Sequence, residues 1–449
     1  MSKSNSSHYQ DFTRLDQWLY YLENLHSSEI DLGLTRIGKV ATRLEIDLSF
    51  AKVITVAGTN GKGTTCAFIE NALLSKQLQF HVENCQTQST ENQPPKVAVY
   101  SSPHINHFNE RLRINKSDVE DQPLIKAFNK IELARGDISL SYYEYTTLAA
   151  LLVLMDIKPD FIILEVGLGG RLDATNIIDA DIAVITTIDL DHQSFLGNDR
   201  ETIGFEKAGI MRQGRDIVIG DTDTPKSVLA HAKSLQATHG ENLFVREQDF
   251  RITDIDDSWG WHAEQTNLPE LKATYIPRDN VATALMVLEK LNVKLTTMFV
   301  NEVISATKVI GRTELIKQKG QSDVILDVGH NPQAARYLAS YLKQIKKQKN
   351  YQIIYGVVSM LADKDISSSL HSLKDSVDVW YTGALNVPRA ATSQAMEGYL
   401  TSFSDKVNCF DNIEEAFKIV NQQASKNDLI LVFGSFFTVA KIRSQLITV

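Results

Sequence analysis

The stretch Val56-Ala-Gly58-Thr59-Asn60-Gly61-Lys62-Gly63-Thr64-Thr65 decides the fold of this 449-residue chain. It ends a run of β-branched residues at 52–57, which is typical of a buried strand. It also opens a segment, residues 64–78, whose apolar residues recur at the i,i+4 spacing of a helix. A glycine-rich turn between a strand and a helix is the arrangement of a phosphate-binding loop.

The residue types in this turn suit a nucleotide. Closely spaced glycines let backbone N–H groups surround phosphate oxygens, and the start of the helix adds a favourable dipole. Lys62 would hold the β- and γ-phosphates, and the Thr64 hydroxyl would be a ligand for Mg²⁺. The pattern departs from a strict Walker A sequence, because Val56 replaces a glycine and Gly63 separates Lys62 from Thr64. An ordinary glycine turn is the alternative.

Short apolar runs alternate with longer amphipathic stretches along the rest of the chain, which predicts mainly parallel sheets covered by helices. We therefore expect an α/β protein. Its N-terminal P-loop NTPase-like domain would span residues 1–310, and a smaller C-terminal Rossmann-like domain would span 311–449. The polar segment 81–96 reads as a surface loop without catalytic duty. The other expected strands are 97–100, 161–166, 182–188, 324–328, 353–358, 377–382 and 429–433, and further helices are expected at 280–291 and 297–309.

Composition narrows the class of protein. Hydrophobic residues make up 43% of the chain and charged residues 22%, which excludes a disordered or fibrous chain. The 46 Lys and Arg against 55 Asp and Glu give a net charge of −9, which argues against nucleic-acid and membrane partners. The three cysteines, Cys66, Cys85 and Cys409, are too scattered for a disulfide framework or a zinc site. The start, MSKSNSSHYQDF, has no apolar core of a signal peptide, so a cytoplasmic protein is expected.

Polar side chains at other strand ends are further candidates. Glu165 lies near the end of an apolar strand, where Mg²⁺ would offset the cost of burying a carboxylate. The alternative is pairing with Arg171 or a backbone amide. His192 follows another strand, and a lone histidine there is more often a hydrogen-bonded structural residue. Ser102 reads as a cap or a metal ligand, and Lys207, on a helix, as a solvated charge or an ion-pair partner.

Taken together, the motifs resemble the folylpolyglutamate synthase/dihydrofolate synthase family of the Mur ligase superfamily, above all its bacterial bifunctional members. They run in the family's order from about Trp18 to Val439. One departure is Thr313, where a phenylalanine is common, and another is the IPRDN approach to Asn280. The matching stretches are DLGL (31–34), AGTNGKGTT, YSSPH, SYYEYTTLAAL (141–151), LEVGLGGRLDATN, DLDH, FEKAGI, GRTEL, DVGHNP and FGSFFTVA.

The resemblance implies roles for individual residues. ATP would be bound by Thr59, Asn60, Gly61, Lys62, Gly63, Thr64, Asn280, Arg312 and Asp327, and magnesium by Ser102, Glu165, His192 and Thr64. The pterin substrate would lie against Asp31, Leu32, Gly33, Ser141, Tyr142, Tyr143, Glu144, Leu172, Asp173 and Ala174, and the amino acid against His330 and Ser435. Lys62, Lys207 and His330 would be the catalytic residues, with Lys207 carrying a CO₂-derived carbamate.

The reaction implied is ATP-dependent amide formation with ATP and two Mg²⁺. A pteroate carboxylate would attack the γ-phosphate to give an acyl phosphate, which the amine of L-glutamate would then displace. The partners would be dihydropteroate, reduced folates and L-glutamate. The protein would be a monomer, and its two domains would close around the acyl phosphate to exclude water. The alternatives are a monofunctional folylpolyglutamate synthase, another Mur-type amino-acid ligase and a nucleotide-dependent switch. A switch would leave the polar strand ends of the second domain unexplained.

Overall fold

In the computed structural model, residues 12–26, 31–80, 94–255 and 258–447 are described, and the chain divides into two compact units. Unit 1 holds Met1–His104, Phe108–Thr274 and Arg278–Ala306. Unit 2 holds Thr307–Val449 together with two short pieces, Ile105–His107 and Tyr275–Pro277, that interrupt the sequence of unit 1. The main part of unit 2 begins at Thr307, close to the domain boundary expected between residues 310 and 311. The sequence did not predict that two short pieces from earlier in the chain belong to unit 2. Most of the segment 81–96 lies outside the described residues.

Unit 1 is built on an eight-stranded sheet in the order β4-β3-β2-β5-β1-β6-β7-β8. The strands from β2 to β8 in this order run parallel, and β3 and β4 are antiparallel additions at one edge. The predicted, mainly parallel sheet is therefore confirmed. Its strands are β1 (Lys52–Ala57), β2 (Val97–Tyr100), β3 (Leu112–Ile114), β4 (Ser117–Asp118), β5 (Phe161–Glu165), β6 (Ile182–Ile185), β7 (Asp216–Ile219) and β8 (Leu243–Val245).

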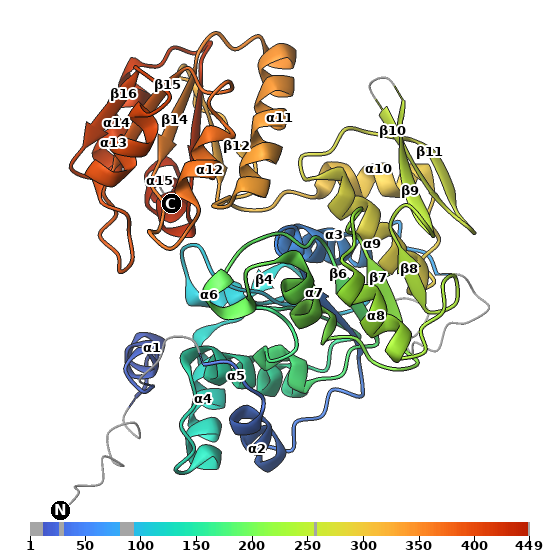
Figure 1. Ribbon diagram of the computed structural model, residues 1–449. Coiled ribbons are helices and arrows are strands. Elements are labelled where there is room, and N and C mark those ends of the chain that lie inside the picture. Colours follow the sequence, from blue (N-terminus) through green and yellow to red (C-terminus); the bar gives the residue numbers. More distant parts are fainter. Residues whose placement is uncertain (1–11, 27–30, 81–93, 256–257, 448–449) are drawn as a thin grey trace, which may run out of the picture. The chain divides into compact units, whose positions relative to one another are not determined.

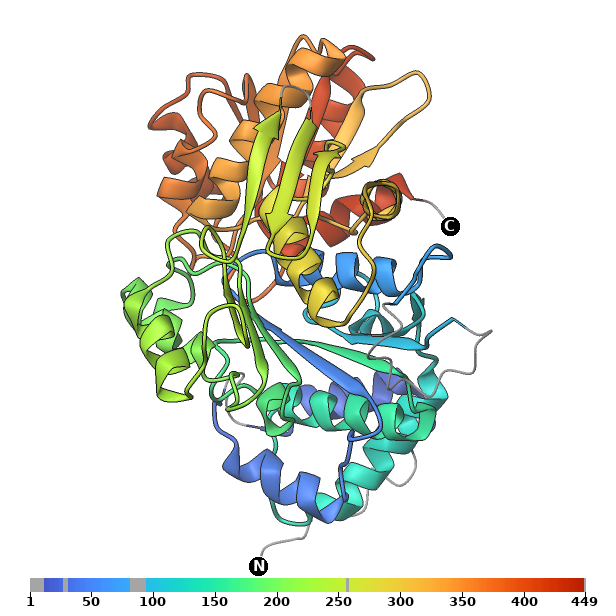
Figure 2. The same ribbon diagram turned by 90° about the vertical axis from the view of Figure 1, so that its right-hand side faces the viewer.

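Helices cover both faces of this sheet (Figure 2). One face packs against α3 (Lys62–Leu73) and α9 (Arg278–Lys290), with α10 (Thr297–Ala306) beside α3. On the other face, apolar side chains of β1, β2 and β5 join one core with α1, α2, α4 and α5, while those of β6 and β7 pack under α7 and α8. These helices are α1 (Leu15–Glu23), α2 (Thr35–Arg43), α4 (Asp121–Arg135), α5 (Tyr142–Ile157), α7 (Arg200–Ala208) and α8 (Lys226–Ser234). Short turns of helix are η3 (Phe108–Arg111), η4 (Ala174–Ile177) and α6 (Gln193–Leu196).

A three-stranded antiparallel sheet, ordered β11-β10-β9, extends unit 1 and was not predicted. Its strands are β9 (Phe250–Ile255), β10 (Ser258–Ala263) and β11 (Asn267–Leu271). Trp259 and Trp261 are two residues apart in β10, so their side chains lie on the same face of the strand, and both are buried. The Trp261 indole donates to the carbonyl of Ala282 in α9 at 3.1 Å, which ties this sheet to the helix that carries Asn280.

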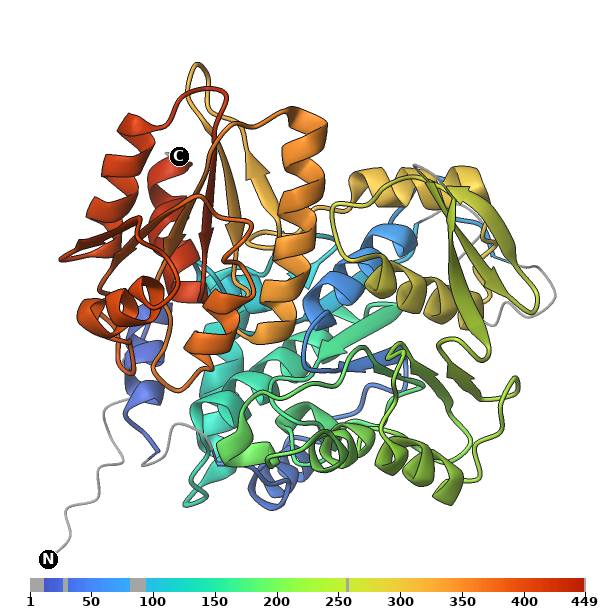
Figure 3. The same cartoon turned by 45° about the horizontal axis from the view of Figure 1, so that its top comes forward.

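Unit 2 is a six-stranded sheet in the order β12-β13-β17-β14-β15-β16, parallel except for β12. Its strands and helices are the orange and red part of the chain (Figures 1 and 3). One face packs against α11, α12 and α13, and the other against α14 and α15. This is the Rossmann-like arrangement that the sequence predicted. The elements are β12 (Glu314–Ile316), β13 (Asp323–Asp327), β14 (Ile354–Val358), β15 (Val379–Gly383), β16 (Val407–Phe410), β17 (Leu429–Phe433), α11 (Pro332–Lys349), α12 (Ile366–His371), α13 (Ser393–Thr401), α14 (Ile413–Gln423) and α15 (Phe436–Leu446).

The helix after the glycine-rich turn differs from its predicted bounds of 64–78. It begins at Lys62, because Gly61 takes a left-handed conformation with φ of 88° and stands as its N-cap. It ends at Leu73, five residues early, where the Leu74 N–H closes the last turn on the Glu70 carbonyl. Apolar spacing alone does not mark where a last turn closes. In the described part of the chain, none of the helices is long and apolar enough to span a bilayer.

Candidate active site

The glycine-rich turn lies between the carboxyl end of β1 and the start of α3, as predicted. The Lys62 ammonium donates to the carbonyl oxygens of Gly58 at 2.8 Å and Thr59 at 3.3 Å, so its charge lies over the turn. The positive end of the α3 dipole points to the same place. A lysine and a helix start that converge on one loop favour the binding of phosphates over an ordinary glycine turn.

Asn280 and Thr64, 216 residues apart in sequence, meet at this loop. The Asn280 side-chain amide donates to the Thr64 hydroxyl at 2.7 Å, and that hydroxyl donates to the Gly61 carbonyl at 2.9 Å. A Cβ at Gly61 would collide with the Asn280 side chain, and its φ of 88° also favours glycine. The structure thus brings together two of the residues expected to bind ATP.

Glu165 ends β5 and is buried beside the turn. A Cβ built on Gly63 would lie 3.6 Å from both carboxylate oxygens of Glu165, so the carboxylate faces the first turn of α3. Arg171 pairs instead with Glu206, at 2.8 Å, which removes the Arg171 alternative for Glu165. The described residues contain no cluster of three or more His, Cys, Asp or Glu side chains with the spacing of a metal site.

The other two expected metal ligands, Ser102 and His192, follow two further strands of the same sheet, β2 and β6. His192 follows β6 in a left-handed conformation with φ of 51°, and its N–H donates to the Asp191 carboxylate at 2.8 Å. Ser102 follows β2, and its side chain is hydrogen-bonded to the Tyr143 hydroxyl. Since β2, β5, β1 and β6 are adjacent and parallel, their carboxyl ends share one edge of the sheet.

Lys207 is buried in α7, contrary to the solvated charge or ion-pair partner that its sequence context suggested. Gly170 lets α7 pack closely, because a Cβ there would lie 2.9 Å from the Lys207 carbonyl oxygen. Burial, together with the nearby positive charge of Lys62, lowers the pKa of Lys207 to about 7. An amine with this pKa is substantially neutral near physiological pH.

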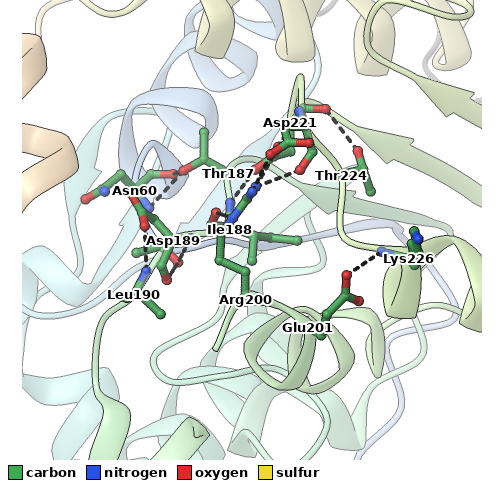
Figure 4. Close-up of polar contacts among 12 residues, drawn as sticks. Asn60, Thr187, Ile188, Asp189, Leu190, Arg200, Glu201, Asp221, Thr224 and Lys226 are labelled. Carbon is green, nitrogen blue, oxygen red and sulfur yellow. Dashed lines mark hydrogen bonds and ion pairs between the residues drawn. The ribbon is translucent and has the colours of Figure 1, made fainter. Parts of the chain in front are cut away.

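The end of β6 holds the glycine-rich turn, a contact that the sequence motifs did not indicate (Figure 4). Thr59 donates its N–H to the Thr187 carbonyl at 2.7 Å. Its hydroxyl exchanges two hydrogen bonds with the backbone of Asp189, both at 3.0 Å. The Asn60 N–H donates to the Thr187 hydroxyl at 3.2 Å. The signal in the sequence that could have indicated this contact is the pair Thr186 and Thr187, which directly follows the apolar strand β6.

The expected pterin-contacting residue Asp31 lies next to α2. Its carboxylate pairs with Arg36 at 2.7 Å and contacts the His26 ring at 3.1 Å. Arg36 also reaches both carboxylate oxygens of Glu144 at 3.2 Å. Asp31 does not cap α2, because the N-cap residue is Leu34. The sequence did not indicate that Arg36 joins these two candidates.

Ser141 and Glu144, also expected near the substrate, form the capping box of α5. The Ser141 hydroxyl accepts from the Glu144 N–H at 3.3 Å, and the Glu144 carboxylate accepts from the Ser141 N–H at 2.8 Å. The S-x-x-E pattern signals this motif. Asp173 has a structural role too: it is buried and accepts from the N–H groups of Gly167, Leu168 and Thr175 at 2.9–3.1 Å.

The neighbours of these residues complete the group. The Tyr143 hydroxyl lies 3.5 Å from Asp173, and Tyr143 stacks with Tyr100. Burial and the charge of Asp173 raise the pKa of Tyr143 well above its usual value, so its phenol is protonated and can donate. Tyr142 lies under the Arg111 guanidinium at 5.5 Å. The remaining candidates are Leu32 and Gly33, next to Asp31, and Leu172 and Ala174, next to Asp173.

We expect Ser141→Ala to lower the free energy of unfolding by about 1 kcal/mol, because it removes the acceptor that caps α5. Urea unfolding followed by circular dichroism measures the change. Ser340→Ala, which replaces an exposed serine inside α11, is the matched control and should stay within about 0.5 kcal/mol of the parent. Equal stability of the Ser141→Ala and Ser340→Ala variants would contradict the capping role.

In unit 2, the expected residues gather at the carboxyl ends of the neighbouring strands β13 and β17. Buried Asp327 accepts from the N–H groups of Thr313 and Gly329 at 2.8 and 2.7 Å. The Arg312 guanidinium lies 5.4 Å from the centre of the Phe436 ring. Thr313, the departure from the family pattern, donates its hydroxyl to the Tyr275 carbonyl at 2.6 Å and so secures one of the two short pieces of unit 2.

Two more expected residues lie at the same edge of this sheet. Ser435 is the N-cap of α15 and accepts from the Thr438 N–H at 3.0 Å. The Nδ1 atom of His330 lies 2.8 Å from the Val328 carbonyl oxygen. A carbonyl only accepts, so Nδ1 carries the proton and Nε2 is the basic nitrogen of the neutral ring.

Comparisons with known proteins agree with this architecture. Residues 56–288 match the Mur ligase middle domain, and residues 311–436 match the Mur ligase glutamate ligase domain. The dihydrofolate synthase/folylpolyglutamate synthase of Escherichia coli (strain K12) is 39% identical over 428 residues, which cover 95% of this chain and 94% of that protein.

Two solved structures extend the likeness to three dimensions. E. coli FolC in complex with DHPP and ADP has a TM-score of 0.86 at 38% identity and covers 99% of both chains. A bifunctional folylpolyglutamate synthase/dihydrofolate synthase with Mn, AMPPNP and L-glutamate bound has a TM-score of 0.84 at 39% identity and covers 99% of this chain and 100% of that one. The chain therefore belongs to the dihydrofolate synthase/folylpolyglutamate synthase family of Mur ligases and is an ATP-dependent ligase.

Proposed function

We propose that this ligase joins L-glutamate both to dihydropteroate, which forms dihydrofolate, and to reduced folates that already carry glutamate. The observation that carries the proposal is the gathering of Lys62, Glu165, Lys207 and Asn280 around the glycine-rich turn of a parallel sheet. The bifunctional relatives, and the DHPP, AMPPNP and L-glutamate named with their structures, support the substrate classes.

The first half-reaction is phosphoryl transfer. A carboxylate oxygen of the pteroate or folate attacks the γ-phosphorus of ATP, which breaks the bond to ADP and forms an acyl phosphate. Lys62 and the N–H groups at the start of α3 stabilise the negative charge that spreads over the transferring oxygens. Thr59 and Asn60 are held by the end of β6, so the loop is ordered before the nucleotide binds.

Magnesium fits the donor set of this edge of the sheet. Buried Glu165 faces the first turn of α3, and the hydroxyls of Thr64 and Ser102 supply the oxygen ligands that Mg²⁺ prefers. Together with His192 these residues would hold two ions. The metal, when bound, neutralises phosphate charge during the transfer.

We propose that the neutral Lys207 amine forms a bond to the carbon of CO₂ and releases one proton, which gives a carbamate. The reaction needs a neutral amine, which a pKa of about 7 supplies, and it exchanges a buried ammonium beside Lys62 for a buried anion. The carbamate attracts the Lys62 ammonium, whereas the two ammoniums repel each other. Its oxygens also give the site a further carboxylate-like ligand.

The second half-reaction is amide formation. The L-glutamate amine attacks the acyl carbon, inorganic phosphate leaves, and the amine gives up one proton. In unit 2, we assign that proton to Nε2 of His330, because the Val328 carbonyl holds the other ring nitrogen in its protonated form. Ser435, at the start of α15, is assigned to the amino-acid substrate.

The test is product formation by the purified protein with MgATP and L-glutamate. Dihydropteroate should give dihydrofolate, and a reduced folate should gain glutamate, each with one ADP per bond, as resolved by liquid chromatography and mass spectrometry. ADP release should require both the acyl and the amine substrate. An enzyme that extends reduced folate but makes no dihydrofolate would be a folylpolyglutamate synthase only.

The pterin site gives a variant with a selective effect. We expect Asp31→Ala to raise the KM for dihydropteroate about tenfold, equivalent to about 1.4 kcal/mol, while the KM for ATP changes less than twofold. A carboxylate accepts paired donors from a pterin edge, and Asp31 is held in place by Arg36 and His26. Equal changes in both KM values would contradict the assignment. Asp47→Ala, an exposed aspartate in the segment after α2, is the control.

A further inference from the structure

A single ion pair holds both peptide groups of Ile188, just beyond the end of β6. Arg200 Nε donates to the Ile188 carbonyl oxygen at 2.8 Å, and the Asp221 carboxylate accepts from the Ile188 N–H at 2.6 Å. Arg200 and Asp221 are themselves paired at 3.3 Å. The Asp221 side chain is only 7% exposed. We call these two residues the Arg200–Asp221 clamp (Figure 4).

The residues on each side of Ile188 hold the glycine-rich turn. The Thr187 carbonyl accepts from the Thr59 N–H, and the backbone of Asp189 exchanges two hydrogen bonds with the Thr59 hydroxyl. The segment 187–189 is therefore bound on one side by the clamp and on the other by the loop. A shift of Ile188 must move at least one of its neighbours, because consecutive peptide units are rigid.

The same arginine begins the helix that carries Lys207. Arg200 is the first residue of α7, whose N-cap Asp199 accepts from the Thr202 N–H at 2.8 Å. His192 lies three residues beyond Asp189 in the connection from β6 to α7. One guanidinium thus joins the segment before His192, the start of α7 and the support of Thr59.

We propose that Arg200 and Asp221 are a positioning pair, which fixes Thr59, His192 and Lys207 relative to one another for ATP and magnesium binding. The inference rests on the roles proposed above for those three residues. The pair is only partly buried, since the Arg200 side chain is 34% exposed, and such a pair is weak evidence for stability, because desolvation and solvent screening offset the charge attraction. Here, however, each charged partner is bound to the backbone of the segment that carries the site. A displacement of about 1 Å costs on the order of 100-fold in rate when a reaction depends on alignment.

The geometry selects the variants. Arg200→Lys keeps the positive charge but loses the fork that reaches Ile188 and Asp221 together. Asp221→Asn keeps the shape, but its NH₂ group must face a donor, since the Asp221 carboxylate accepts from the Ile188 N–H, the Asp223 N–H and Arg200. Asp223→Asn is the matched control: this side chain is 87% exposed and also pairs with Arg200, but it does not touch the segment 187–189.

Steady-state kinetics with dihydropteroate, L-glutamate and varied ATP and Mg²⁺ test the proposal. We expect Arg200→Lys and Asp221→Asn to raise the KM for ATP and the half-saturating Mg²⁺ concentration at least about tenfold. The KM for L-glutamate should change less than twofold, and Asp223→Asn should match the parent in all three quantities. The double variant should lose little more than either single variant, because the two residues act as one unit.

A merely structural role predicts a different pattern. It would lower kcat in proportion to the folded fraction, measured by circular dichroism, and leave the values for ATP and Mg²⁺ unchanged, which would overturn the proposal. Lys62→Ala, assayed in parallel, separates this failure from a failure of the site assignment. If Lys62→Ala keeps its activity, the site itself is misplaced and the clamp proposal falls with it. If Lys62→Ala is inactive and both clamp variants match Asp223→Asn, only the clamp proposal is wrong.

Discussion

Lys62→Ala is expected to lower kcat by about 100- to 1,000-fold while the protein stays folded. The lysine ammonium lies over the glycine-rich turn, where it meets the carbonyl oxygens of Gly58 and Thr59. An alanine there leaves the transferring phosphoryl oxygens without their positive partner. The fold should survive, because alanine is the best helix former and position 62 is the first residue of α3.

The measurement is ADP release at saturating ATP, with circular dichroism and thermal unfolding recorded for the same sample. Lys52→Ala is the matched control, because Lys52 is the first residue of β1, the strand whose other end leads into the glycine-rich turn. Lys52 pairs there with Asp181 at 3.4 Å. It should change kcat less than twofold. Turnover near the parent value in Lys62→Ala would reject the phosphate-binding assignment.

Lys207→Ala should lose activity to a similar extent and recover part of it when short carboxylates such as formate or acetate are added. The reason is chemical replacement: the buried space left by the side chain can take a free carboxylate in place of the carbamate oxygens. Lys207→Arg is the decisive companion variant, because it keeps a positive charge but cannot form the carbamate. An active Lys207→Arg enzyme would show that a cation suffices at this position.

The carbamate also has a pH signature. With a pKa of about 7, about half of the Lys207 amines are neutral at pH 7, whereas an ordinary lysine is neutral in roughly one molecule of 2,500. The neutral amine is the form that reacts with CO₂, so after removal of CO₂ the recovery of activity should be faster at pH 8 than at pH 6 when the concentration of dissolved CO₂ is the same at both pH values. Carbon-13 NMR of the protein in labelled bicarbonate should show a carbamate signal that Lys207→Ala lacks. A bare ammonium at saturating bicarbonate would contradict it.

Local sequence predicted the parallel core of each sheet well. The strand Leu429–Phe433 has its predicted bounds, because all five of its residues are buried and a continuous apolar run marks such a strand. The antiparallel sheet β9–β11 was missed, since its strands carry charged and polar residues and pack only on one face. The alternation of Trp259 and Trp261 was its one clear signal.

Sequence patterns indicated the parts of the candidate site whose residues are consecutive in the chain, such as the glycine-rich turn. They did not indicate the contacts between segments that are distant in sequence. The contact of Asn280 with Thr64 joins positions 216 residues apart, which no local pattern reveals. Burial of Lys207 depends on the close approach of α7 to Gly170, a property of tertiary packing. Ser141 shows that one residue can match two patterns. Its family match suggested a substrate contact, while the S-x-x-E spacing already signalled the cap that the structure contains.

The interrupted boundary of unit 2 limits how this enzyme can be divided or recombined. A gene fusion cut at residue 310 would transfer the sheet of unit 2 but leave Ile105–His107 and Tyr275–Pro277 with the wrong parent. The Thr313 hydroxyl would then have to bond to the residue that replaces Tyr275 in the other parent. Gly311, where a Cβ would lie 2.9 Å from the Ile105 side chain, would pack against the residue that replaces Ile105. Chimeras with relatives should therefore exchange three segments together, namely Ile105–His107, Tyr275–Pro277 and Thr307–Val449.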